Sequence, residues 1–452
     1  MLKSIESFAS TLSSFVWGEY LLIPLLSIVG VYLTLGLRCL PWLKITTAVR
    51  LLMRRPGSGE GEISPRHALM TALSATIGTG NIAGVATAIY FGGPGAVFWM
   101  WLIALFGMAT KYSEAVAAIK FRQVDELGQF VGGPMYYIKN GLGARWRWMA
   151  STFAFFGMIA AFGIGNMVQS NSVADALAST FNIQHMYTGL AMAALVGVVI
   201  LGGIQRIAEV VGKIVPLMAT AYIVCTVLIL ISLRSEIPGA FQLIFTSAFS
   251  GAAASGGFLG ASIWMAIRFG VARGIFSNES GLGSAAIAHG AAKATEPVEQ
   301  GLVAMLGTFI DTLVICTLTA LVLLVTGAWS SGENGAAMST YAFSTGFGSI
   351  GAQIVSIGLA IFAFTTIIGW SYYGERCAAY LLGTGIITFY RLIWVAAVFI
   401  GALFKLGLIW TLADIFNGLM ALPNLIALLL LSPIIFTETR NYFRRARIEH
   451  DK

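Results

Sequence analysis

The sequence predicts an all-α polytopic membrane protein with about 11 transmembrane helices. Hydrophobic residues make up 57% of the 452 residues and charged residues only 10%, against roughly 25% charged residues in soluble domains. Apolar segments recur along the whole chain at the length that crosses a bilayer, about 20 residues. These two observations exclude a soluble protein. The net charge of +7 is concentrated in particular loops, as in membrane proteins, and does not indicate a nucleic-acid partner.

Eleven segments are apolar enough to cross the membrane. They run roughly over Leu21–Leu37, Leu69–Tyr90, Ala96–Ile119, Met149–Ala176, Tyr187–Leu201, Ile214–Leu233, Phe258–Ala292, Leu302–Thr326, Ile350–Tyr372, Ile386–Leu403 and Trp410–Leu431. The seventh is too long for one straight crossing, so we expect it to be interrupted. The segment Met1–Gly18 before them is amphipathic, and we interpret it as a short helix at the membrane interface.

The basic residues give an orientation. Most of them lie in alternate loops or after the last span: Arg38, Lys44, Arg50, Arg54, Arg55, Arg66, Lys120, Arg122, Lys139, Arg145, Arg147, Arg206, Lys213, Arg440, Arg444, Arg445 and Arg447. Positively charged loops stay in the cytoplasm. We therefore expect a multi-pass protein of the cell (inner) membrane, with its N-terminus outside and its C-terminus in the cytoplasm.

One span has a helix-breaking centre. Gly78-Thr79-Gly80-Asn81 lies in the middle of Leu69–Tyr90, and glycines interrupt helices. A broken helix in lipid survives only where it lines a polar cavity. Its free amides attract an anion and its free carbonyls a cation. The alternative is close helix packing through Gly80 and Gly84, which have the small-xxx-small spacing.

A second interruption is predicted in the seventh span, where polar residues and glycines occupy Arg273–Ser284. Both interrupted spans begin a block of five spans, and the odd number places the two blocks in opposite orientations. Interrupted helices at matching positions of inverted halves indicate the site of a secondary transporter. The predicted organisation has four parts: residues 1–66 with the interfacial helix, an extra span and a basic loop, the repeats 67–235 and 236–432, and a basic tail 433–452.

The sequence resembles the alanine or glycine:cation symporter family, also called sodium:alanine symporters. The segments that carry the resemblance are Gly92–Gly107 (GGPGAVFWMWLIALFG), Met108–Glu114 (MATKYSE), Arg273–His289, Asp311-Thr312 and Ala413–Met420 (ADIFNGLM). The resemblance covers nearly the whole chain. It implies a leucine-transporter-type 5+5 inverted repeat with one extra N-terminal span, and small neutral amino acids carried with Na⁺.

Ten residues are predicted to bind the substrate. Thr79, Gly80 and Asn81 are the candidates for its carboxylate, at the start of a half-helix. Ser277 and Asn278 at the second break are the candidates for its ammonium group. Around them we expect an aromatic wall and amide groups from Phe162, Asn166, Gln169, Phe276 and Trp370. The i, i+4 and i+3 spacing predicts that Phe162, Asn166 and Gln169 share one helical face. Asn and Gln also commonly join helices in membranes, and Trp370, chosen because it resembles a family pocket residue, has the interfacial aromatic belt as its alternative.

The coupling ion is assigned by the resemblance. The hydroxyls of Thr365 and Thr366, with carbonyls near Ala75 and Gly78, match the sodium site of this fold, although threonine also bonds back to its own helix. Asp311 is a further candidate, since a charge within a span is functional or paired by default. It is predicted to add to a cation site, to carry a proton, or to pair with Arg268 or Arg273. Arg391, near a span end, is expected to extend to the interface.

These observations favour an importer of alanine or glycine that uses Na⁺ and no cofactor. The alternatives are coupling to protons through Asp311 or Glu279, and a passive channel. An enzyme is not expected, because the sequence contains no HExxH motif, no GxSxG elbow and no paired catalytic aspartates. The four cysteines have no paired spacing that would indicate a metal site or a disulfide framework.

Overall fold

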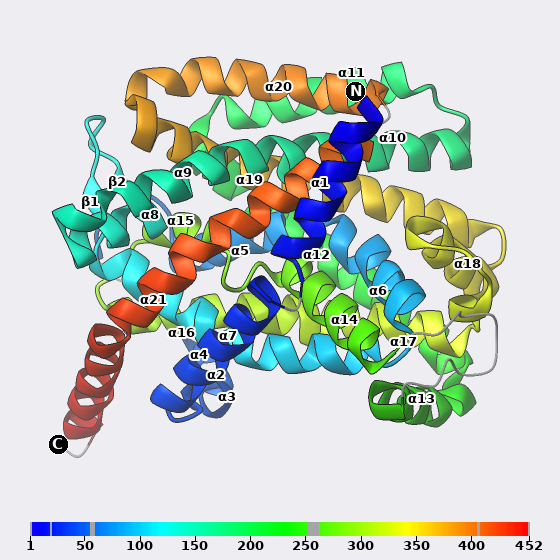
Figure 1. Cartoon of the computed structure of the whole chain (residues 1–452), viewed down its shortest axis with the longest axis horizontal. Helices are drawn as coiled ribbons and strands as arrows, with labels where there is room; N and C mark the ends of the chain where they lie inside the picture. The colour runs from blue at the N-terminus through cyan, green and yellow to red at the C-terminus, as the bar shows by residue number, and fades with distance from the viewer. Residues whose placement is uncertain (1, 19, 55–58, 251–261, 405–406, 451–452) are drawn as a thin grey trace.

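The structure is a computed structural model that describes all residues except 1, 19, 55–58, 251–261, 405–406 and 451–452. Arg55, residues 56–58 and the predicted start of the seventh span at Phe258 lie outside the described residues. Helices form nearly all of the described chain (Figure 1). The α-helices are α1 (Leu2–Val16), α2 (Leu22–Gly36), α3 (Leu40–Leu43), α4 (Ile45–Met53), α5 (Pro65–Thr76), α6 (Val85–Gly92), α7 (Ala96–Lys120), α8 (Pro134–Tyr137), α9 (Arg147–Phe162), α10 (Val168–Phe181), α11 (His185–Ile200), α12 (Gly203–Ser232), α13 (Ile237–Ser250), α14 (Ile263–Asn278), α15 (Ser284–Gly290), α16 (Pro297–Thr308), α17 (Thr317–Val325), α18 (Gly335–Phe347), α19 (Ile350–Leu382), α20 (Ile387–Leu403) and α21 (Gly407–His450).

Shorter elements connect these helices. Segments of π-helix lie at Gly80–Gly84, Ile138–Leu142, Gly163–Met167 and Phe309–Cys316, and turns of 3₁₀-helix at Ala144–Trp146, Arg234–Glu236, Ala328–Ser330 and Thr384–Ile386. The two strands β1 (Gln123–Val124) and β2 (Phe130–Val131) form an antiparallel hairpin between α7 and α8. The π-segments at Gly80 and Gly163 and the one that holds Asp311 interrupt long apolar helices, which is where such segments often mark functional sites.

The chain is a multi-span membrane protein. Seven helices are long and apolar enough to cross a membrane, or eight when the bent pair Pro65–Thr76 and Gly80–Gly92 counts as one span. The eleven predicted segments include three that this count leaves out, namely α2 and α11, which are shorter apolar helices, and the seventh segment. The seventh is divided into α14 and α15, and neither is long enough alone.

Some helix–helix contacts repeat between the two halves of the chain. When α5, α7, α9–α10, α11 and α12 are matched in chain order with α14, α16, α19, α20 and α21, three contacts between the two groups have a counterpart. The pair α7–α14 corresponds to α5–α16, α9–α21 to α12–α19, and α10–α20 to α11–α19. Part of the packing of the first group of helices on the second is therefore retained when the two groups are exchanged.

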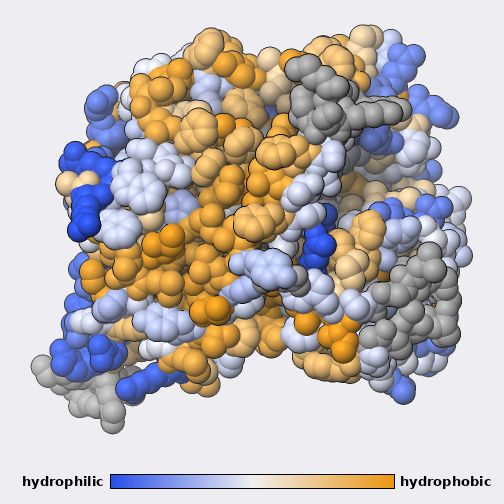
Figure 2. Space-filling model, viewed as in Figure 1, coloured by the Kyte–Doolittle hydropathy of each residue, from blue (hydrophilic) through white to orange (hydrophobic). Residues whose placement is uncertain are grey.

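The N-terminal helix is more than an interfacial element. α1 packs along α21, and Figure 1 shows the two crossing the front of the molecule. Val16 and Trp17 at its end are buried, and Trp17 Nε1 donates a hydrogen bond to the Asp414 carbonyl oxygen at 2.9 Å. Apolar residues cover most of the middle of this face, while hydrophilic residues gather where α21 leaves the bundle (Figure 2).

Candidate binding site

The first predicted break is present. α5 ends at Thr76, and the chain resumes as helix at Gly80 with a bend of 53°. Asn81 Oδ1 accepts a hydrogen bond from the Gly78 amide at 2.8 Å. Among the described residues, no hydrogen-bond acceptor faces the amides of Thr79 and Gly80. Two buried donors at the start of a half-helix are therefore free, and this arrangement suits an anion.

The second break is also present, and the amides of residues 279–283 all have hydrogen-bond acceptors. α14 ends at Asn278, Glu279 has a left-handed φ of 56°, and α15 begins at Ser284. The amides of Gly281 and Gly283 both donate to Glu114 Oε1 at 3.1 Å. Buried polar groups need such partners, since an unpaired one costs about 1–3 kcal/mol.

Asp311 joins the two breaks. Its carboxylate accepts from Asn81 Nδ2 at 2.6 Å and from Ser277 Oγ at 2.9 Å, and it is fully buried. Thr312 Oγ1 also donates to it at 2.7 Å. The alternative in which Asp311 forms an ion pair with Arg268 or Arg273 is wrong, because neither arginine bonds to Asp311. Neutral donors from both broken helices hold this charge instead.

A large cavity leads to this cluster. It encloses about 980 Å³, reaches Thr79 and Phe276, and is bordered by Arg273, by α18 and by the first turns of α19. The two breaks touch at its floor, since a Cβ on Gly80 would lie 3.4 Å from Phe276 Cδ1 and from Ser277 Cα. Figure 1 shows α6, α14 and α18 on the same side of the molecule. The free amides of the first break therefore lie at the end of an open path.

Three oxygens converge beside Gly78. A Cβ there would lie 2.5 Å from Thr366 Oγ1 and 3.6 Å from Gln169 Oε1, and Gln169 Oε1 has no hydrogen-bond partner among the described residues. Thr366 Oγ1 lies 3.5 Å from the Ile77 carbonyl oxygen. Hydroxyl, amide and carbonyl oxygens are the ligands that a hard cation prefers.

The hydroxyl of Thr365 does not join this group. Both threonine hydroxyls bond back to the Phe362 carbonyl, at 2.9 Å from Thr365 and 3.0 Å from Thr366, but the Thr365 hydroxyl faces Met218 Sδ at 3.5 Å. Successive helical residues point about 100° apart, so only one of two adjacent threonines can face the break. Ala75 packs against α19, because a Cβ on Gly369 would be 3.0 Å from the Ala75 amide nitrogen.

Phe162 and Asn166 face another helix. Phe162 packs its ring on Tyr390 and Trp394 of α20, and Asn166 Nδ2 donates to the Trp394 carbonyl at 2.9 Å. The prediction that both residues share one face with Gln169 is wrong. The π-segment Gly163–Met167 turns the helix more slowly than an α-helix, so Gln169 points elsewhere.

The predicted pocket tryptophan, Trp370, is fully buried beside the second break. Its side chain is 1% exposed, which excludes the aromatic-belt alternative. Trp370 Nε1 donates to Glu279 Oε1 at 2.8 Å. Its Cβ lies against Gly165, where an added Cβ would approach it to 2.2 Å. Asn278 Nδ2 donates to Thr312 Oγ1 at 3.0 Å, so Asn278 supports the Asp311 cluster.

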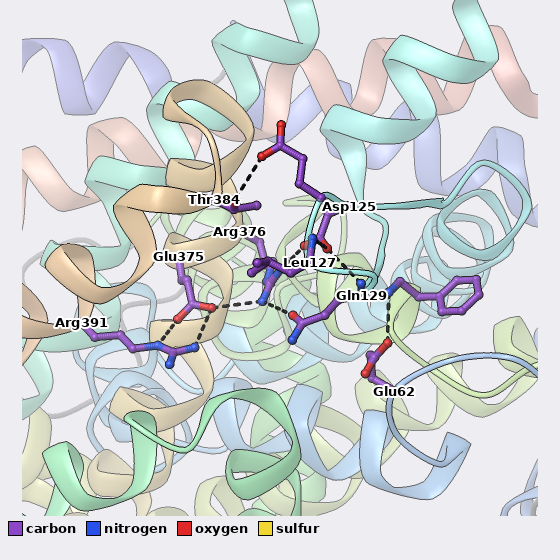
Figure 3. A network of polar contacts seen from close by, with 10 residues as sticks. Glu62, Asp125, Leu127, Gln129, Glu375, Arg376, Thr384 and Arg391 are labelled. Carbon is purple, nitrogen blue, oxygen red and sulfur yellow. Dashed lines mark hydrogen bonds and ion pairs between the residues drawn. The ribbon is translucent and has the colours of Figure 1, made fainter.

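A network of ion pairs holds the opposite end of α19 (Figure 3). Arg376 bonds to Asp125 of the hairpin at 3.0 Å and to Glu375 at 3.2 Å. Arg391 of α20 donates to both oxygens of Glu375, at 2.6 and 3.0 Å. The expectation that Arg391 extends to the interface is therefore wrong. The cavity borders one end of α19 and this network ties down the other end.

Sequence reasoning missed several groups that shape the site. The Ile77 carbonyl oxygen can face the candidate ion site because α5 ends at Thr76, the residue before it. Glu114 binds the second break together with Asn424, whose Nδ2 donates to it at 2.7 Å. Lys111 Nζ has no hydrogen-bond partner among the described residues. A buried acid and a buried amide in apolar spans were the only signals in the sequence.

Two broken helices meet within the multi-span bundle and lie beneath a cavity, and ion pairs hold the other end of the bundle. This arrangement defines a secondary transporter. The comparisons identify which kind. The chain matches the sodium:alanine symporter family over residues 2–452 and belongs to that family. It is therefore a transporter and not an enzyme.

Two relatives agree with this family assignment, and a solved structure agrees with the fold. The chain is 50% identical to the sodium/alanine symporter AgcS of Methanococcus maripaludis over 96% of this chain and 97% of that protein. It is 38% identical to the probable sodium/glutamine symporter GlnT of Bacillus subtilis over 100% of this chain and 93% of that protein. The manganese transporter of Eremococcus coleocola, crystallised with an aromatic bis-isothiourea compound, has the same fold, with a TM-score of 0.51 and 13% identity over 83% of this chain and 78% of that one.

Proposed function

We propose that this protein imports small neutral amino acids, alanine or glycine, together with Na⁺ by alternating access. The observation that carries the proposal is the meeting of the two breaks at Asp311, with the free amides of Thr79 and Gly80 at the floor of the cavity. The family assignment and the name of the relative AgcS support the same function.

The substrate carboxylate binds the amides of Thr79 and Gly80, where the partial positive charge of the half-helix favours an anion. Its ammonium group faces the polar groups of the second break at Ser277 and Asn278. The rings of Phe276 and Trp370 restrict the side chain to a small size. Asn81 and Ser277 act by fixing both breaks on Asp311.

Na⁺ binds beside Gly78 to Thr366 Oγ1, Gln169 Oε1 and the Ile77 carbonyl, with the carbonyls of Ala75 and Gly78 as further ligands. The described residues contain no group of three or more His, Cys, Asp or Glu side chains that would hold a metal ion. A site of neutral oxygens fits Na⁺, and these oxygens do not take up a proton at physiological pH.

Alternating access follows from two inverted halves, 67–235 and 236–432, within eleven spans. The exchanged packing of the helices supports this repeat. The cavity opens to the outside in the orientation predicted by the basic loops, with the C-terminus in the cytoplasm. The Asp125–Arg376–Glu375–Arg391 network then closes the cytoplasmic end.

Uptake of labelled alanine into proteoliposomes, with Na⁺ and proton gradients imposed separately, tests the proposal. We expect accumulation against the alanine gradient only with inward Na⁺, inhibition by glycine, and no uptake of leucine or phenylalanine. Uptake driven by protons without Na⁺, and lost in Asp311→Asn, would instead establish proton coupling. If Na⁺ drives uptake of glutamine in preference to alanine, the assigned substrate is wrong and the assigned coupling ion is correct.

A further inference from the structure

A groove outside the transport path carries a concentration of positive charge. It encloses about 310 Å³ between the end of α2, α3 and the last third of α21. Three cationic side chains line it, Arg38, Lys44 and Arg440, and no acidic side chain does. The remaining lining is largely apolar and includes Leu43, which is 72% exposed, and the rings of Phe436 and Phe443.

Two acids on or beside α21 are engaged elsewhere. Glu438, on the same helix, pairs with Lys120 at 2.7 Å, and Glu296 pairs with Arg445 at 3.0 Å. Arg38 makes no hydrogen bond or ion pair with any described residue, and Arg440 reaches only Thr437 Oγ1, at 3.4 Å. Lys44 Nζ lies over the Phe443 ring at 5.4 Å. The groove therefore has uncompensated positive charge.

Two exposed apolar rows lead up to these charges. Ile426, Leu430 and Ile434 repeat every four residues on α21 and are 38–45% exposed. On α2, Ile28 and Leu35 are 63% and 67% exposed. The helices pack on each other, and Tyr32 OH lies 3.0 Å from Ser432 Oγ between them. The arginines of the groove follow these rows along the chain, Arg440 six residues after Ile434 and Arg38 three residues after Leu35.

The change from apolar to cationic side chains marks the level at which acyl chains give way to headgroups. In Figure 2, hydrophilic residues likewise gather where α21 leaves the bundle, below a largely apolar surface. We propose that this groove binds one anionic phospholipid, whose phosphodiester contacts Arg38, Lys44 and Arg440. An acyl chain lies along the α2–α21 seam. Guanidinium groups match a phosphate through paired hydrogen bonds, and basic pockets between transmembrane helices bind anionic headgroups.

The base of the groove is closely packed, which supports a preformed binding site. A Cβ on Gly36 would lie 2.1 Å from Phe436 Cζ, so the ring rests directly on the α2 backbone. Tyr32 packs its ring on Phe436 at 5.9 Å. These contacts fix the base of the groove, while the three cations around its rim remain available to a ligand.

Native mass spectrometry of delipidated protein tests the proposal with phosphatidylglycerol and phosphatidylcholine as probes. Wild type should bind one phosphatidylglycerol at least tenfold more tightly than phosphatidylcholine. Each cation near a membrane surface contributes about a fivefold change, so Arg38→Gln, Lys44→Gln and Arg440→Gln together should weaken phosphatidylglycerol on the order of a hundredfold at low salt. Arg440→Gln alone, at an exposed position, should weaken it about fivefold.

The matched control neutralises three other basic positions, Arg145→Gln, Arg206→Gln and Lys213→Gln, and should retain wild-type lipid binding. An equal loss in this control would show a general surface-charge effect and overturn the proposal. So would equal affinity for the two lipids in wild type, or full displacement of phosphatidylglycerol by millimolar glycerol phosphate. The measurement is independent of the transported substrate, so its outcome does not depend on the proposed function.

Discussion

The two helix breaks differ in how their polar groups are used. At the first break the amides of Thr79 and Gly80 and the Gln169 Oε1 atom have no hydrogen-bond partner among the described residues. At the second break Gly281 and Gly283 donate to Glu114, and Asn424 donates to the Gly281 carbonyl at 2.9 Å. The two breaks therefore differ in their hydrogen bonding: the first leaves amides without acceptors in the described part of the chain, and the second provides its amides with acceptors from the protein.

This difference indicates a division of labour. A buried polar group without a partner destabilises the empty protein by about 1–3 kcal/mol, so the first break gains most from a ligand. The amides of the second break already have hydrogen-bond acceptors within the protein, so this break acts as a fixed support. Asp311 couples them, because it accepts hydrogen bonds from Asn81 of the first break and Ser277 of the second. Four predictions test this comparison.

The largest effect is expected at the second break. Glu114→Ala leaves two amides and the Asn424 side chain without their acceptor, so we expect the free energy of unfolding to fall by about 3–5 kcal/mol. Thermal unfolding in detergent, followed by size-exclusion chromatography, measures the loss. Glu209→Ala is the control, because Glu209 is exposed and pairs only with Lys213. Wild-type thermal stability in Glu114→Ala would remove the distinction between the breaks.

Asn81→Ala affects the link between the breaks. The variant loses hydrogen bonds to the Gly78 amide and to Asp311, of which the second involves a charged group worth about 1.5–3 kcal/mol. We expect alanine to bind roughly tenfold to a hundredfold more weakly, with the protein still folded. Isothermal titration at saturating Na⁺ measures this. Normal alanine affinity with a lowered melting temperature would assign Asn81 a purely structural role.

Gly78→Ala introduces a methyl group among the three converging oxygens. The new Cβ would lie 2.5 Å from Thr366 Oγ1, which must move away. We expect the Na⁺ concentration for half-maximal uptake to rise about tenfold. Gly84→Ala in the same broken helix is the matched control, because nothing lies within 4 Å of its Cβ position. An equal effect of both substitutions would indicate a change in helix bending and not in the ion site.

The smallest effect distinguishes two adjacent threonines. Thr366→Ala removes a hydroxyl that faces the Ile77 carbonyl, whereas Thr365→Ala removes one that faces Met218. We expect a several-fold weaker Na⁺ dependence in the first variant and an unchanged one in the second. Linkage requires alanine to raise Na⁺ affinity by the same factor as Na⁺ raises alanine affinity. Equal Na⁺ dependence of the two variants would contradict the assignment.

The sequence by itself determined the membrane class, the approximate spans and the positions of both breaks. The physical reason is local. Apolar length is fixed by bilayer thickness, and glycine with polar residues weakens a helix wherever it stands. The residues of the family resemblance also lie within a match that covers residues 2–452.

Only the tertiary structure decided which side chains satisfy the breaks. Glu114 reaches Gly281 across 167 residues of sequence, and Arg391 finds Glu375 on a neighbouring helix. A π-segment turned Phe162 away from Gln169, and one helical step separated Thr365 from Thr366. A buried charge selects its partners from whatever the fold brings within hydrogen-bond distance, and a helical pattern read along one segment carries no information about its neighbours.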